Sequence, residues 1–141
     1  MSNRSKVPRP GLRARSVWLR DHAEAAFGFL VSERGFSGPE IHDHGLTYHS
    51  PIGAIEILYD EHVQDVETLA CGPVGDVYVR ACVSCLLVEA GLGPAQHVKT
   101  VARTTHGLKV ALASQADAVR RLLLKLEADD RSELLSACYA R

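Results

Sequence analysis

The sequence predicts a single α+β domain: an N-terminal helix, a three-stranded antiparallel meander, and C-terminal helices packed on the sheet. Apolar residues recur at helical spacing in the first and last parts of the chain, and they alternate with polar residues in the middle. The 141 residues, 46% of them hydrophobic, are enough for one core, which excludes a disordered chain. No apolar run reaches the ~18 residues of a membrane span, so a transmembrane protein is excluded as well.

The first helix is predicted over residues 17–34, with Ser16 as its N-cap and Gly35 as its C-cap. Its apolar residues fall three and four apart on one face: Leu19, Ala23, Ala26, Phe27, Leu30 and Val31. Residues 1–15 contain two prolines and a glycine among basic and small polar residues. We therefore expect a flexible basic arm over residues 1–15 and a single folded domain over residues 16–141.

Three strands are predicted in the middle of the chain. The apolar residues that alternate with other residues in the first two strands are Leu46, Tyr48, Ile55, Ile57 and Tyr59. Turns at residues 50–53 and 60–62 separate these strands from each other and from a third strand over residues 63–71. Because the connections are short, the three strands are expected to form an antiparallel meander.

The rest of the chain is predicted to be helical. Asp76 would cap a helix over residues 77–90, and a longer amphipathic helix would cover residues 108–128. A short last helix is expected over residues 133–140. Any exposed part of the leucine-rich segment 108–126 would provide a face for homo-oligomers, whereas a wall of the core explains the same pattern.

The four cysteines are predicted to be reduced. They are Cys71, Cys82, Cys85 and Cys138. The basic N-terminus is not followed by the apolar stretch of a secretory signal, so we expect a cytoplasmic protein without disulfides. Cys82 and Cys85 have a CxxC spacing, but they lie in an apolar run that is typical of a mid-helix segment, and no second ligand pair follows. We interpret the cysteines as core residues.

The charges of the chain are segregated. Lys and Arg number 16 and Asp and Glu 17, so the formal net charge is only -1. Residues 1–20 nevertheless carry six basic residues and no acidic one, whereas residues 35–79 carry eight acidic residues and no Lys or Arg. Such an asymmetry is informative about partners, which the net charge alone is not.

Four short motifs in the first half of the chain form a recognisable combination: Phe27-Gly28-Phe29-Leu30, Arg34-Gly35-Phe36, Leu46-Thr47-Tyr48-His49-Ser50 and Ile55-Glu56-Ile57-Leu58-Tyr59-Asp60. It resembles small bacterial α+β proteins, some of which are grouped with immunity proteins of polymorphic toxin systems. The resemblance covers about residues 23–69, and the C-terminal helices only by their layout. It implies a protein that binds a toxin domain and has no enzymatic activity of its own.

The acidic middle is the leading candidate for a functional surface. A sheet surface with many acids and no base would steer a basic protein partner, such as a basic toxin domain, toward it. The residues expected to bind this partner are Glu56, Asp60, Glu61, His62, Asp65 and Glu67. A solvated face that serves only solubility explains the same charges.

A first alternative function is nucleic-acid binding by the basic arm. Its candidate residues are Arg4, Arg9, Arg13 and Arg15. Several such side chains can bind phosphates with salt-dependent and sequence-independent affinity. Contact of the arm with the acidic sheet of a second copy, or a solvated arm, explains the same composition.

A second alternative is a small metal-dependent enzyme. His42 and His44 are two residues apart, so on a strand both would face the same side, as a metal pair does. A solvated edge or loop explains the same pair. The chain has no GxSxG, P-loop or GxGxxG motif. We therefore expect no enzymatic activity, no cofactor and no catalytic residue.

Overall fold

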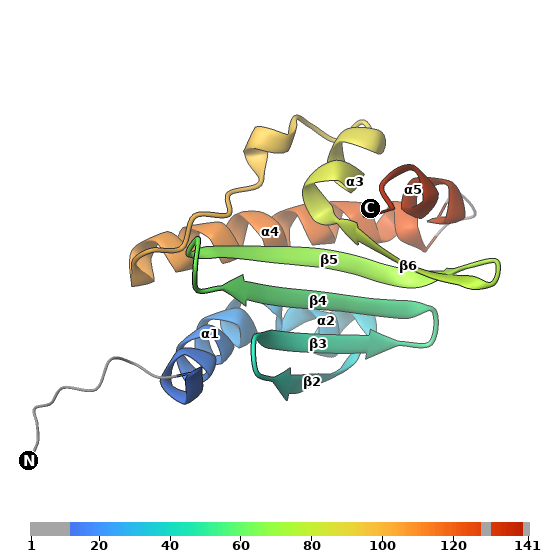
Figure 1. The fold of residues 1–141 in the computed structure, drawn as a ribbon. Coiled ribbons are helices and arrows are strands. Elements are labelled where there is room, and N and C mark those ends of the chain that lie inside the picture. Colours follow the sequence, from blue (N-terminus) through green and yellow to red (C-terminus); the bar gives the residue numbers. More distant parts are fainter. Residues whose placement is uncertain (1–11, 128–130, 140–141) are drawn as a thin grey trace, which may run out of the picture.

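A computed structural model describes residues 12–127 and 131–139 of the chain (Figure 1). The elements in chain order are α1 (Leu12–Phe27), α2 (Phe29–Arg34), β2 (Ser37–His42), β3 (Gly45–Ser50), β4 (Gly53–Asp60), β5 (Asp65–Val74), β6 (Val77–Cys82), α3 (Val83–Glu89), η1 (Ala95–His97), α4 (Thr105–Leu126) and α5 (Arg131–Ala137). No helix in the described ranges is long and apolar enough to cross a membrane.

The strands form one antiparallel sheet in the order β2-β3-β4-β5-β6, so every strand lies beside its neighbours in the sequence. The helices pack on one face of this sheet (Figure 1), and inward side chains of β3 to β6 join them in a single large core. The opposite face is not covered by any element of the described chain. The predicted α+β class is confirmed, and the three predicted strands correspond to β3, β4 and β5.

The predicted helix over residues 77–90 is wrong in its first half, because these residues form β6. Gly75 and Asp76 make a two-residue turn, with Gly75 at a φ of 60°, and Val77 pairs directly with Val74. Val79 and Ala81 then point into the core while Tyr78 and Arg80 remain exposed, which is the period of a strand. The helix α3 begins only at Val83.

The strand β2 was not predicted, and it forms one edge of the sheet. Its residues are exposed except for the half-buried Pro39, so it lacks the apolar alternation that reveals a strand. Pairing with β3 over Glu40 to His42 holds it in place. The sheet therefore has two more strands than the sequence pattern indicates.

The N-terminal helix begins at Leu12 rather than at residue 17, and it is interrupted at Gly28, after which α2 continues to Arg34. Gly35 caps α2, as expected. Its φ of 77° is left-handed, and this conformation ends the helix. Residues 12–15 of the predicted arm thus belong to a helix, and residues 1–11 lie outside the described residues.

The long helix α4 forms a wall of the core. Thr104 caps it, since its Oγ1 accepts a hydrogen bond from the Gly107 N–H at 2.9 Å. The leucines of this helix that are buried in the core are Leu108, Leu112, Leu122, Leu123 and Leu126. Burial in the core therefore accounts for these leucines, whereas Leu124 of the same helix is 70% exposed.

A polar side chain in this wall, Gln115, is completely buried and fully hydrogen-bonded. Its Nε2 donates to the backbone O of Val66 at 2.9 Å and of Lys99 at 2.7 Å, and its Oε1 accepts from Thr68 Oγ1 at 2.7 Å. Gln115 therefore ties α4 to β5 and to the segment between η1 and α4.

The prediction that all cysteines are reduced is wrong for two of them. Cys85 in α3 and Cys138, which follows α5, form a disulfide between positions 53 residues apart. The mid-helix placement of the CxxC pair is also wrong, because Cys82 ends β6 and precedes the first residue of α3. Cys71 lies within β5, and both Cys71 and Cys82 are free thiols.

We expect Cys85→Ser to lower the free energy of unfolding by about 2–4 kcal/mol, because the disulfide closes a long loop in the unfolded chain. The measurement is urea unfolding with and without dithiothreitol. The reductant should destabilise the wild type and leave Cys85→Ser unchanged. Cys82→Ser serves as the control, and an equal loss in that variant would contradict the assignment.

We expect Gln115→Leu to lower the free energy of unfolding by about 1–3 kcal/mol, since it leaves the Thr68 hydroxyl and two backbone carbonyls without their partner. Thermal or urea unfolding measures the loss. Gln96→Leu, at an exposed position of η1, is the matched control. Equal stability of the two variants would refute a role of the buried amide.

Candidate functional site

The open face of the sheet carries the outward residues of β4, β5 and β6. Leu69 and Cys71 lie at its centre and are nearly inaccessible, and Ala54, Leu58 and Cys82 pack against them in a second small cluster. Charged side chains flank this cluster. The open face is thus apolar at its centre and charged around it.

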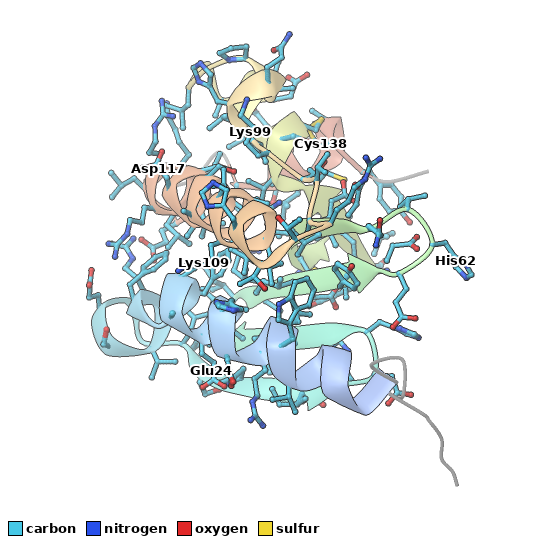
Figure 2. The ribbon with its side chains drawn as sticks, turned by 90° about the vertical axis from the view of Figure 1, so that its left-hand side faces the viewer. Glu24, His62, Lys99, Lys109, Asp117 and Cys138 are labelled. Carbon is cyan, nitrogen blue, oxygen red and sulfur yellow. A yellow bond between two sulfur atoms is a disulfide. The ribbon has the colours of Figure 1, made fainter. Side chains whose placement is uncertain are left out.

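At the end of the sheet where β4 turns into β5, the surface forms a hollow of about 570 Å³, which we call the acidic hollow. Its lining residues are His44, Leu58, Tyr59, Asp60, Glu61, His62, Val63, Asp65 and Glu67. Five of the six residues predicted to bind a partner, all but Glu56, therefore line one site. Figure 2 shows His62 at the outermost point of this turn, directed away from α1 and α4.

The turn between β4 and β5 is shaped by its own backbone and side chains. The carboxylate of Asp60 accepts a hydrogen bond from the His62 N–H at 2.9 Å, as in an Asx turn. Gln64 has a φ of 56°, which is uncommon for a residue other than glycine. Asp60 and Asp65 are direct cross-strand partners, and like charges in such a pair are destabilising. The end of this hairpin therefore concentrates negative charge at the expense of its own stability.

The segment that leads into α4 supports the acidic hollow from behind. The Val66 N–H donates to Thr100 O at 2.9 Å, and the Ala102 N–H donates to Gln64 O at 2.8 Å. Since Gln115 also binds Lys99 O, this segment is anchored to the core. The backbone that presents the acids is thereby held on both sides.

One aromatic residue, Tyr59, lines the acidic hollow, and Trp18 packs against its ring. The ring of Trp18 meets that of Tyr59 edge-on, with centroids 5.5 Å apart. The indole N–H of Trp18 donates to Thr105 Oγ1 at 3.0 Å, which connects α1 to the start of α4. Contacts between elements that are far apart in the sequence therefore support Tyr59.

Glu56 does not belong to the acidic hollow. Its Oε1 lies 2.6 Å from Arg80 Nη2 and 3.1 Å from Arg80 Nε, so β6 supplies a cation that the sequence did not reveal. This ion pair crosses the open face near its centre. The negative charge of Glu56 is thus compensated by Arg80.

The two free thiols lie on the open face and are not activated. Burial, and next to it the charge of Glu67, raises the pKa of Cys82 to about 11, and its Sγ donates to Glu67 Oε2 at 3.3 Å. Burial, and next to it Glu56, raises the pKa of Cys71 to about 12. Arg80 lies opposite Cys71 on β6 and acts to lower this pKa, but burial outweighs its charge. Neither thiol is a thiolate nucleophile at neutral pH.

The predicted histidine pair is not a metal pair. His42 ends β2, and its Nε2 lies 2.9 Å from Thr47 Oγ1. His44 lies in the turn between β2 and β3 and lines the acidic hollow, so the two side chains do not share a face of one strand. Across residues 12–127 and 131–139, no group of three His, Cys, Asp or Glu side chains is arranged to hold a metal ion.

The residues proposed for nucleic-acid binding are only partly within the described chain. Arg4 and Arg9 lie outside it, while Arg13 and Arg15 belong to the first turns of α1. In Figure 1, α1 begins on the same side of the molecule as the turn between β4 and β5.

Sequence reasoning missed the apolar and aromatic part of the site. Leu58 falls among the polar residues of the alternation in β4. The sequence pattern therefore contained the signal that places Leu58 on the outward face of this strand. Val63 was assigned to a strand and lies in the turn instead. His44 reaches the hollow only through the turn between β2 and β3, for which the sequence held no signal.

The comparisons with known proteins add no relative to this description. No protein-family model matches the chain, and searches of curated proteins and of solved structures find no match either. The resemblance to immunity proteins therefore stays a prediction.

We expect Glu67→Gln to lower the pKa of Cys82, because it removes a neighbouring negative charge that raises this pKa. A lower pKa increases the thiolate fraction, so iodoacetamide should alkylate Cys82 faster at pH 8 than in the wild type. Peptide mass mapping over time measures the rate at this cysteine alone. Glu133→Gln on α5 is the control and should leave the rate unchanged. A slower reaction of Glu67→Gln would contradict the stated cause of the shift.

Proposed function

We propose that this protein is a non-enzymatic interaction protein, of an immunity or defence type, that binds a basic protein partner. The acidic hollow and the adjoining open face of the sheet form the binding surface. One observation carries the proposal: the acids of the β4–β5 hairpin gather around one hollow whose lining contains no Lys or Arg. The immunity-like assignment rests on the resemblance of residues 23–69.

The electrostatics of the acidic hollow support a cationic partner. Asp60, Glu61, Asp65 and Glu67 carry four negative charges at one hairpin end. Charges of one sign around a concave surface focus the field and raise the association rate of an oppositely charged partner. Because Asp60 and Asp65 repel each other across the strands, a bound Lys or Arg would also relieve this repulsion.

The apolar residues of the site support a protein partner rather than a simple ion. Val63 is 57% exposed at the turn, and Leu58 lies half-buried between the acids and the apolar centre of the open face. An apolar centre with a polar rim is the usual composition of protein–protein interfaces.

We expect Asp65→Lys to weaken the binding of a basic partner by about tenfold or more while leaving the fold intact. The substitution replaces a repulsive pair with Asp60 by an attractive one, so the melting temperature should stay equal or rise. A fluorescent arginine-rich peptide serves as the probe, and its anisotropy is titrated at low and at moderate salt. A loss of binding together with a lower melting temperature would point to a structural role and count against the proposal.

The matched control is Asp117→Lys, which makes the same change of charge at an exposed position of α4, on the helical side of the molecule (Figure 2). This variant should bind the peptide as the wild type does, apart from the small effect of net charge. A cell-based test uses the double variant Glu61→Lys and Asp65→Lys together with a toxin encoded beside the protein. Unchanged protection by the double variant would refute the proposed surface.

A further inference from the structure

A second concave site lies at the opposite end of the sheet, where β3 turns into β4; we call it the end pocket. It has a volume of about 210 Å³ and lies between the β3–β4 turn, the C-terminal end of α4 and α5. Along β4, Ile55 is the last residue that lines the end pocket and Leu58 the first that lines the acidic hollow, so the nearest lining residues are about 10 Å apart at the rise of a strand. The β3–β4 turn, which borders the end pocket, and the β4–β5 turn, which borders the acidic hollow, lie at opposite ends of the sheet (Figure 1).

The walls of the end pocket are apolar. Its side chains from the core are Phe36, Ile55, Ala70, Leu123, Leu126 and Leu135, all of them buried. The lining also includes Ile52, which is 45% exposed in the β3–β4 turn, so the space is reached from solvent. Protein cores hold few voids larger than a water molecule, which makes a space of this size in a core wall a candidate for a ligand.

The rim of the end pocket carries a positive charge that no carboxylate of residues 12–127 and 131–139 pairs. Arg34 Nη2 lies 2.5 Å from Glu127 Oε1, so these two charges neutralise each other. Arg131, the first residue of α5, donates from Nη1 to the backbone O of Ile52 at 2.8 Å. Within the described part of the chain, Arg131 has no carboxylate partner, and most of the N–H donors of its guanidinium are not used by this bond.

From these observations we infer that the end pocket binds a small molecule with an apolar body of about the size of one substituted aromatic ring and a carboxylate. An apolar cavity of about 150 Å³ is enough for benzene, so about 210 Å³ holds a ring with a short substituent. The apolar body lies against Ile55, Ala70 and Leu126. The carboxylate binds the guanidinium of Arg131, whose fork of donors matches two carboxylate oxygens.

The inference does not depend on the proposed function, because the two sites share no lining residue. An aromatic side chain of a protein partner could occupy the same walls. The uncompensated charge of Arg131 favours a ligand with its own carboxylate instead, and a neutral side chain would leave that charge unpaired.

The test uses 3-phenylpropanoate as the probe and 3-phenylpropan-1-ol as its neutral analogue of nearly equal shape. Methyl resonances of Ile55, Leu126 and Leu135 are followed by NMR during titration of the intact protein. We expect the acid to shift these resonances with a Kd of about 1 mM or tighter, and the alcohol to bind at least about fivefold more weakly. Equal affinity of the two compounds would overturn the proposal. So would the absence of any shift of these resonances at an acid concentration about 10 times the expected Kd.

Two variants test the guanidinium of the rim and the apolar walls of the end pocket separately. Arg131→Gln should remove the preference for the acid over the alcohol, whereas Arg121→Gln should keep it, because Arg121 donates to the backbone O of Leu92 outside the pocket. Leu126→Phe should fill the space and weaken both compounds. If Leu126→Phe lowers the melting temperature strongly, Arg131→Gln alone tests the proposal, since it changes only the rim of the end pocket. An unchanged preference in Arg131→Gln would refute the role of the guanidinium.

Discussion

Within residues 12–127 and 131–139, the helices cover only one face of the sheet, and the arrangement of the charged surface depends on this constraint. Inward residues such as Ile57 are completely buried, whereas outward neighbours such as Leu58 remain within reach of solvent. The outward side of such a sheet faces water, so it needs polar side chains over its apolar residues. Here the ion pair of Glu56 and Arg80 lies over Leu69. The open face is consequently the part of the molecule in which charges can be arranged for a partner.

The buried amide of Gln115 links the core to that surface. It holds the start of β5 and the segment before α4 together, and the carboxylates of the acidic hollow project from the hairpin that these two segments support. A repulsive pair such as Asp60 and Asp65 is tolerable there because its cost is a fraction of the stability of the well-packed core beneath. The like charges therefore destabilise the hairpin only locally, and the packed core keeps its backbone in place.

The two ends of β4 present opposite chemistry. At the β4–β5 turn, acids surround a partly apolar floor, and at the β3–β4 turn, an apolar space is bordered by Arg131. The disulfide of Cys85 and Cys138 joins α3 to the chain after α5, and Figure 2 places Cys138 among the helices rather than on the open face. The covalent link thus stabilises the helical layer and leaves both concave sites free of direct involvement.

The sequence by itself determined the α+β class, the central strands β3 to β5, the long helix α4 and the set of acids at the β4–β5 hairpin. These features depend on local periodicity and on residues close in the chain, which a sequence pattern records directly. Only the tertiary structure decided that residues 77–82 form a strand, that Glu56 is paired with Arg80, and that Cys85 reaches Cys138. The ion pair and the disulfide depend on segments that meet in space although they are far apart in sequence. The strand β6 follows β5 after a two-residue turn, and its pairing with β5 overrode a helical pattern. The acids were visible in the sequence, but the hollow they surround exists only because the turn before β3, the β4–β5 hairpin and the segment before α4 meet at one end of the sheet.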